Sequence, residues 1–198
     1  MSDPARGERA LHADALTLLE SWTAPDAGQA ALRDRFVAHL RRHPDGVRRG
    51  CRPDHLTASA LILSADRGRV LLTLHAKARE WFQTGGHCEP GDTTLAGAAL
   101  REAVEESGVL GLTLDPVPVQ LDEHAVPFCS PGGTVHHLDV RFLAVAPEEA
   151  SHMTSVESLD VAWWPVDALP TEEPGLLALV RLARDRLAGQ STGSSSAI

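Results

Sequence analysis

The chain has 198 residues, of which 43% are hydrophobic and 23% are charged, and its formal net charge is −9. This length allows one domain with a full core and an extension. The negative charge argues against broad binding to the phosphate backbone of nucleic acids, and no apolar run in the sequence approaches membrane-spanning length.

The cysteines and the N-terminus indicate the compartment. Cys51, Cys88 and Cys129 form an odd and scattered set, which argues against a disulfide framework and favours a reducing environment. Residues 1–9 are polar and contain no apolar core of a signal peptide. We therefore expect a cytoplasmic protein with no membrane partner and no nucleic-acid partner.

The first elements in the chain are two amphipathic helices. Apolar residues recur at helical spacing over 8–21 and again over 27–43, and Pro25 and Gly28 mark the turn between them. Residues 1–50 therefore predict a helical hairpin placed before the main domain. Such a hairpin could cover an active site or form a homodimer contact, and the sequence leaves both open.

The rest of the chain alternates between strand and helix patterns without regular βαβ spacing. We expect strands over 56–63, 69–75, 117–126, 135–145 and 161–164, helices over 94–107 and 176–187, and one helical turn over 166–169. A mixed sheet covered on both faces by helices fits this order. We divide the chain into an extension (1–50), a main domain (51–188) and a serine- and glycine-rich tail (189–198) that we expect to be disordered.

The most informative segment is a glycine-rich loop, residues 85–92, that runs into a helix with three carboxylates. Glu102, Glu105 and Glu106 stand at i, i+3 and i+4, so they share one helical face, while apolar residues occupy another. Like charges this close repel one another unless a divalent cation lies between them. Carboxylate oxygens are the ligands that Mg²⁺ and Mn²⁺ prefer.

This segment resembles the Nudix box, Gly-x5-Glu-x7-Arg-Glu-U-x-Glu-Glu-x-Gly-U, in which U is apolar and which spans Gly86–Val109 here. There are two departures from the pattern. Asp92 stands where the family has its first glutamate, and one extra residue separates it from Arg101. Either Asp92 or Thr93 could take that glutamate's part. The resemblance implies the Nudix α/β/α sandwich, with a mixed sheet and the box at one end of it.

The resemblance also implies an activity. Nudix enzymes are similar in hydrolysing a pyrophosphate bond in a nucleoside diphosphate linked to another moiety, with Mg²⁺ or Mn²⁺ as cofactor. Carried over by position, the box gives metal ligands at Glu102, Glu105, Glu106 and the carbonyl of Gly85. It gives catalytic roles to Arg101, which steadies the glutamates, and to Glu105. The resemblance also implies that an acid on a later loop can be the base, and Glu157 lies in that region, where it could equally be a surface charge. Asp122 and Glu123 are weaker candidates for the general base.

Four residues are candidates for contact with the small nucleotide or diphosphate substrate: Gly86, His87, His137 and Trp81. Glycine lets phosphate approach the backbone closely, histidine can contact phosphate, and a tryptophan can stack on a nucleobase. Trp81 could equally pack in the core, and the histidines could simply be satisfied within the sheet. His55 and His75 have no such context, and we assign them structural roles.

The histidines also suggest a zinc site. If the two strands 117–126 and 135–145 are antiparallel neighbours, His124 and His137 could approach each other near Cys88 or Cys129. Histidine and cysteine are the usual ligands of zinc. No short ligand spacing in the sequence supports this alternative.

Two other functions stay open from the sequence. Isopentenyl diphosphate isomerases are similar in fold and use metal-binding histidines, but they break no phosphate bond. Some Nudix-like domains bind nucleotides without catalysis and have decayed boxes. The intact carboxylates of residues 101–106 favour hydrolysis over both alternatives. The box binds the metal and the diphosphate group. Because every substrate of the family contains that group, the box does not identify the substrate.

Overall fold

The computed structural model describes residues 4–126, 135–154 and 158–193. Its helices are α1 (Pro4–Ser21), α2 (Ala27–Arg42), α3 (Leu95–Ser107) and α4 (Pro174–Gly193). Its strands are β1 (Asp54–Leu63), β2 (Arg69–His75), β3 (Trp81–Phe82), β4 (Thr84–His87), β5 (Thr113–Val126), β6 (Val135–Val145) and β7 (Ser158–Pro165). Over the residues described, none of the helices combines the length and apolarity that crossing a membrane requires.

Strand β1 lies at the centre of a mixed sheet. It runs parallel to β6 along its whole length, and β5 pairs antiparallel with β6 beyond it. The opposite edge of β1 is shared, because β4 pairs with its middle residues, Thr57 to Ala60, and β2 with its last residues. The sheet divides at this point, since β2 continues to β3 and β7 while β4 leads into α3. The expected mixed sheet is confirmed.

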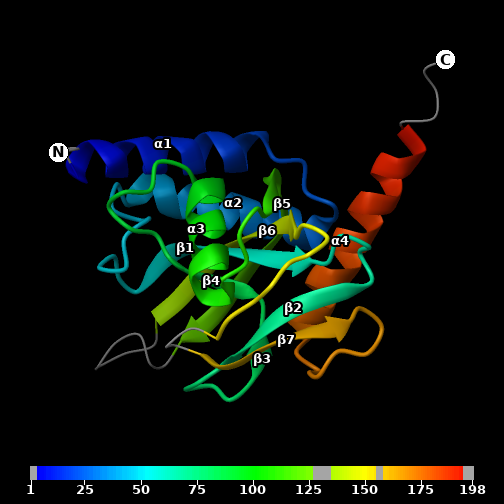
Figure 1. Ribbon diagram of the computed structural model, residues 1–198. Coiled ribbons are helices and arrows are strands. Elements are labelled where there is room, and N and C mark those ends of the chain that lie inside the picture. Colours follow the sequence, from blue (N-terminus) through cyan, green and yellow to red (C-terminus); the bar gives the residue numbers. More distant parts are fainter. Residues whose placement is uncertain (1–3, 127–134, 155–157, 194–198) are drawn as a thin grey trace.

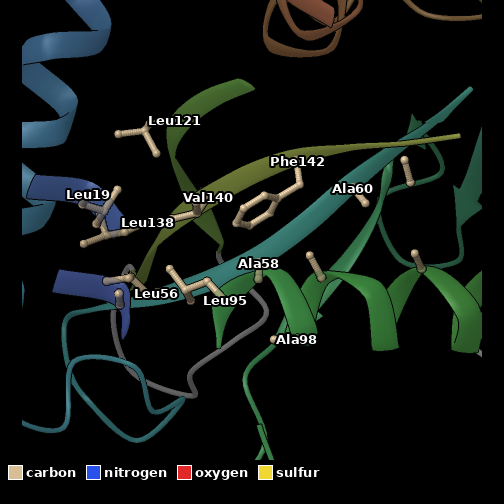
Figure 2. Packing of buried hydrophobic residues seen from close by; sticks show 14 of the residues in the cluster. Leu19, Leu56, Ala58, Ala60, Leu95, Ala98, Leu121, Leu138, Val140 and Phe142 are labelled. Carbon is tan, nitrogen blue, oxygen red and sulfur yellow. The ribbon is translucent and has the colours of Figure 1, made fainter. Parts of the chain in front are cut away.

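The alternating side chains of β1 bury two separate cores. Leu56 and Ala58 point to the face covered by α1, α2 and α3, whereas Leu61 and Leu63 point to the face covered by α4. Figure 1 shows α4 on the other side of the sheet from α1 and α3. In Figure 2, Ala58 of β1 lies close to α3, which can approach the strand because the side chains at this contact are small.

Helix α3 has the boundaries that its sequence predicts. The side chain of Thr94 accepts a hydrogen bond from the Gly97 amide at 3.0 Å, which caps the N-terminus. Gly108 ends the helix in the left-handed region at φ 68°, and its amide donates to the Val104 carbonyl. Asp14 of α1 accepts a hydrogen bond from the Leu95 amide at 2.8 Å, so α1 supports the start of α3.

The N-terminal helix pair packs into the larger core, where Leu19 of α1 lies beside Leu138 of β6 (Figure 2). It also covers the outer edge of β5. The Gln29 side chain accepts from the Leu121 amide at 2.6 Å and donates to the Leu121 carbonyl at 2.9 Å. The indole of Trp22 donates to the carbonyl of Pro118 at 2.8 Å. Both helices are therefore bound to the sheet by polar contacts as well as apolar ones.

Several boundaries differ from expectation: α1 begins at Pro4 and β7 at Ser158, each earlier than expected, and the first residues of the expected glycine loop form β4. Strand β5 starts at Thr113, four residues early, and its register shifts between Asp115 and Gln120, where prolines cannot donate ladder hydrogen bonds. The turn after β7 is a single hydrogen-bonded turn and no helix. Helix α4 continues to Gly193 although we expected disorder from residue 189, because each added helical residue gains a hydrogen bond. Residues 194–198 lie outside the part described.

Candidate active site

Two glutamates of α3 face the glycines of β4. A side-chain carbon placed on Gly86 would lie 2.7 Å from the carboxylate of Glu102, so only glycine leaves this carboxylate in place. One turn further, Glu106 accepts a hydrogen bond from the Gly85 amide at 3.1 Å through Oε2. The pairing of β4 with β1 and the packing of α3 under β1 bring these groups together.

Arg101 connects the loop to the acidic face of the helix. Its guanidinium donates to both carboxylate oxygens of Asp92, at 3.2 and 2.9 Å. It also donates to Glu102 at 2.9 Å, to Glu105 at 3.0 Å and to the carbonyl of His87 at 3.0 Å. The hydrogen bonds that Arg101 donates to Asp92 are the largest cause that raises the pKa of Arg101. One cation therefore fixes two carboxylates of the helix and the end of β4.

Asp92 and Thr93, the two candidates for the part of the first box glutamate, have different surroundings in the structure. Asp92 is buried, pairs with Arg101 and accepts a hydrogen bond from the Glu89 amide at 2.8 Å. Thr93 is exposed. Asp92 therefore carries the contact with the box arginine, and the extra residue before α3 is taken up in the loop that ends at Thr94.

The charges of this cluster favour a bound cation. Burial is the largest cause that raises the pKa of Glu102, and the nearby carboxylate of Glu105 adds to it, while Arg101 opposes both. The side chain of Glu105 is 57% exposed, so it can reach solvent beside the half-buried Glu102 and Glu106. Carboxylate oxygens that share one helical face beside a single arginine are the kind of ligand that Mg²⁺ or Mn²⁺ prefers.

Some expected site residues lie elsewhere or outside the part described. Trp81 stacks edge-on against Trp164, with ring centroids 5.4 Å apart, and packs against the core under α4. It is not brought to the box carboxylates. Glu157 lies in residues 155–157, outside the described part of the chain.

The weaker candidates for the base are held in ion pairs. Asp122 accepts hydrogen bonds from Arg141 at 2.9 Å and contacts His124 at 2.8 Å, and the pKa of Asp122 is lowered by these partners although burial opposes them. Glu123 pairs with Arg35 of α2. Both carboxylates lie on β5, outside the box, and are already engaged in ion pairs.

The opposite face of β4 carries a cluster of histidines. His55 of β1 is in register with His137 of β6, and Thr57 of β1 is in register with His87 of β4. Facing residues of paired strands share one side of a sheet, so the three imidazoles converge. Their ring centroids lie 4.8 to 5.1 Å apart. His55, which we had taken as structural, thus belongs to this cluster, and the sequence missed it because only the β1–β6 pairing reveals it.

Burial sets the charge of these imidazoles. Burial, as the largest cause, together with the charges of the neighbouring histidines and Arg49, lowers the pKa of His87 to about 4 and that of His137 to about 3. His124 behaves differently: burial opposes protonation, but the hydrogen bond to Asp122 raises its pKa overall. Cys88 packs with the core on the α3 side, and Cys129 lies outside the described residues. The expected approach of His124 to His137 is confirmed, since the two residues face each other in register with ring centroids 5.5 Å apart, but Cys88 does not join them and the part with Cys129 stays untested.

A buried polar network that the sequence did not indicate adjoins the histidines on β1 and β6. Asp139, which is 3% exposed, accepts hydrogen bonds from Thr57 at 3.0 Å, Ser59 at 2.7 Å and Arg141 at 2.9 Å. Because all these groups are paired, the network fixes the register of the two strands from which the histidines project.

Comparison with known proteins gives the family. The family model described as NUDIX domain matches residues 53–183. The chain is similar to the crystal structure of a NUDIX-family hydrolase from Clostridium perfringens, at 24% identity and a TM-score of 0.52, over 67% of this chain and 97% of that one.

Two further solved structures share the fold. An Ap4A hydrolase of C. elegans, in a binary complex, is 21% identical with a TM-score of 0.53 over 68% of this chain and 98% of its own. The E. coli dihydroneopterin triphosphate pyrophosphohydrolase is 19% identical with a TM-score of 0.52 over 66% and 95%. A search among curated proteins finds no match. The family match over most of the chain, together with the box geometry, shows that this protein belongs to the NUDIX domain family and is a Nudix hydrolase.

Proposed function

We propose that this enzyme uses Mg²⁺ or Mn²⁺ to cleave a phosphoanhydride bond in a nucleoside diphosphate linked to another moiety. The observation that carries the proposal is the convergence of Glu102 and Glu106 on the two glycines of β4. A solvated acidic helix would not need Glu106 to accept a hydrogen bond from the amide of Gly85 or a glycine to leave room for the carboxylate of Glu102.

The residues fit the metal in defined roles. Glu102 and Glu106 would hold it, with Glu105 and the Gly85 carbonyl as further ligands. When bound, the metal neutralises diphosphate charge and lowers the pKa of a water. Arg101 keeps Glu102 and Glu105 oriented by its hydrogen bonds, and this positioning is what transfer of a phosphoryl group requires most from a protein.

Glu105 is our candidate for the general base among the described residues. One of its oxygens accepts a hydrogen bond from Arg101, and the side chain remains partly exposed. A carboxylate in this position can accept a proton from water. Glu157 remains a second candidate on the basis of its place in the sequence alone.

We assign the contact with the substrate to strand β4. Gly86 lets the carboxylate of Glu102 lie directly against the backbone, so a metal held by Glu102 would bring the diphosphate to this part of the chain. The imidazoles of His87 and His137 lie on the opposite face of the sheet, and Trp81 packs under α4. We therefore propose Gly86, of the four sequence candidates, for direct contact with the diphosphate.

The names of the similar structures suggest where to look for the substrate. One is a hydrolase of Ap4A and another a pyrophosphohydrolase of dihydroneopterin triphosphate, and both compounds contain phosphoanhydride bonds. A screen with Mg²⁺ or Mn²⁺ should therefore include nucleoside triphosphates, nucleotide sugars, dinucleoside polyphosphates, ADP-ribose and dinucleotide cofactors. Phosphate released after phosphatase treatment reports cleavage.

Two variants make the screen decisive. Glu106→Gln should abolish turnover of whichever substrate is found while its melting temperature stays near that of the unaltered protein. Glu80→Gln, an exposed carboxylate outside the box, is the matched control and should retain activity. Full activity of Glu106→Gln would refute the assignment. Tight nucleotide binding without turnover at saturating metal would instead identify a binding domain.

A further inference from the structure

The histidine cluster has the geometry of a metal site. His55, His87 and His137 come from three different strands, and each offers a ring nitrogen that lies within 4.8 Å of the other two. Zinc binds imidazole nitrogen at about 2.0–2.1 Å, so the nitrogens of a tetrahedral site lie about 3.3–3.4 Å apart. Binding would therefore require the rings to move toward one another by rotation about their side-chain bonds.

Two of these imidazoles have a nitrogen that needs a partner. Within the described part of the chain, Nε2 of His55 and Nε2 of His137 are buried and have no hydrogen-bond partner. A buried polar atom left unpaired costs about 1–3 kcal/mol, so such atoms usually mark a missing ligand or water.

The hydrogen bond made by Nδ1 of His55 shows which of its two ring nitrogens can bind a metal. Nδ1 of His55 lies 3.2 Å from the Cys51 carbonyl, which can only accept, so Nδ1 carries the proton and Nε2 carries the lone pair. Metal-binding histidines typically donate their second nitrogen to a backbone carbonyl in this way, which holds the ring in the orientation that coordination needs.

The donor set selects the kind of metal. The cluster consists of nitrogen donors, and imidazole suits zinc and its transition-metal neighbours, whereas Mg²⁺ requires oxygen. His124 does not belong to the set: its ring centroid lies 5.5 Å from that of His137, and its nitrogens are not among the ligand atoms that lie within 4.8 Å of one another. Cys88 packs in the core on the other side of the sheet. Three protein ligands leave one tetrahedral position for water or another small ligand.

We propose that His55, His87 and His137 bind one Zn²⁺ ion on the face of the sheet opposite the box carboxylates. This inference does not depend on the proposed hydrolysis. The ion would tie β4 to β1 and β6. Strand β4 also carries Gly85 and Gly86, and the carbonyl of His87 accepts a hydrogen bond from Arg101. A zinc ion that fixes β4 would therefore also stabilise the position of the box residues on the other face of the sheet.

The test uses the full chain without a histidine tag, stripped of metal by a chelator and then kept in saturating Mg²⁺ so that the carboxylates are occupied. Zn²⁺ is titrated in competition with a chromophoric chelator, and Co²⁺ is titrated in parallel to record its visible spectrum. We expect one ion per chain, a Co²⁺ spectrum typical of a four-coordinate nitrogen site, and a higher melting temperature with Zn²⁺.

Variants locate the site. His87→Gln and His137→Gln should each weaken Zn²⁺ binding by more than about 100-fold, the upper end of the loss seen when only an orienting group is removed. His75→Gln, outside the cluster, and Glu106→Gln, in the box, should bind Zn²⁺ as tightly as the unaltered protein. Far-ultraviolet circular dichroism of the metal-free variants checks that they fold.

Three results would overturn the proposal. One is the absence of stoichiometric Zn²⁺ or Co²⁺ binding by the unaltered protein, which needs no variant at all. Another is retention of tight binding when both His87 and His137 are replaced. The third is loss of binding in Glu106→Gln, which would place the ion among the carboxylates instead.

Discussion

The two faces of strand β4 present opposite chemistries within a few residues of each other. On the α3 side, Gly85 and Gly86 lie against the carboxylates of Glu102 and Glu106. On the other side, His87 joins two further imidazoles. Hard oxygen donors and nitrogen donors are thereby kept apart by the sheet, so one short strand can support two ions of different preference without competition between them.

The two faces of β4 also differ in the contacts that fix their side chains in position. The carboxylate face depends on one side chain, Arg101, which is bonded to Asp92, Glu102 and the end of β4. The histidine face depends on strand register, which the paired network around Asp139 fixes. A change on one face should therefore leave the other largely intact, and the following predictions test that separation.

The largest effect is expected from Glu102→Gln. Removing one carboxylate that would hold the metal should cost several kcal/mol of transition-state stabilisation, or roughly 10²–10⁴ in kcat/KM. Steady-state kinetics on the substrate found in the screen measure this loss. Zn²⁺ affinity, measured on the same protein, should not change. A joint loss of both properties would show that the two faces form a single metal cluster.

Gly86→Ala should act on the carboxylate face through geometry alone. The added methyl would lie 2.7 Å from the Glu102 carboxylate, which is the end of a flexible side chain and can swing away. We expect a loss of about 10²-fold in kcat/KM, typical of a displacement near 1 Å, with little loss of stability. Gly91→Ala is the matched control, since its methyl would meet nothing within 4 Å. Equal kinetics for the two variants would refute the close approach.

Asp92→Asn tests which residue takes the part of the first box glutamate. Loss of the charged hydrogen bonds to Arg101 should lower the free energy of unfolding by about 1.5–3 kcal/mol, as measured by urea denaturation. Thr93→Ala, one residue on and exposed, should change it by less than about 0.5 kcal/mol. A larger effect at Thr93 than at Asp92 would contradict the assignment.

The smallest effect concerns the support of α3 by the N-terminal hairpin. Asp14→Ala removes the acceptor of the Leu95 amide and should lower the free energy of unfolding by about 1 kcal/mol, as removal of a helix cap does. Asp14→Asn keeps an oxygen there and should lose less. If both variants unfold at the same urea concentration as the unaltered protein, the hairpin does not stabilise α3 through this bond.

The sequence predicts what is local. Arg101, Glu102 and Glu106 lie within two helical turns, and Thr94 and Gly108 mark the ends of α3 by their own chemistry, so the helix and its acidic face follow from spacing. Most strands were also placed to within a few residues. The exceptions have physical causes, such as the prolines that disturb the start of β5.

What the sequence could not predict depends on contacts between distant segments. The place of His55 follows only from the parallel pairing of β1 with β6, which no periodicity reveals. The choice between Asp92 and Thr93 required the position of the Arg101 guanidinium. Trp81 matched the expectation of a stacking residue as well as that of a core residue, and its contact with Trp164 shows the latter.

The bonds from Gln29 to Leu121 bear on how two copies of this chain could meet. An edge strand with free amides and carbonyls invites a second sheet to extend it. Here one glutamine amide imitates a neighbouring strand for one residue of β5, and Trp22 and Arg186 occupy the carbonyl of Pro118 next to it. A second molecule could continue the sheet along this stretch only by displacing those side chains, so any self-association of the enzyme should use another surface.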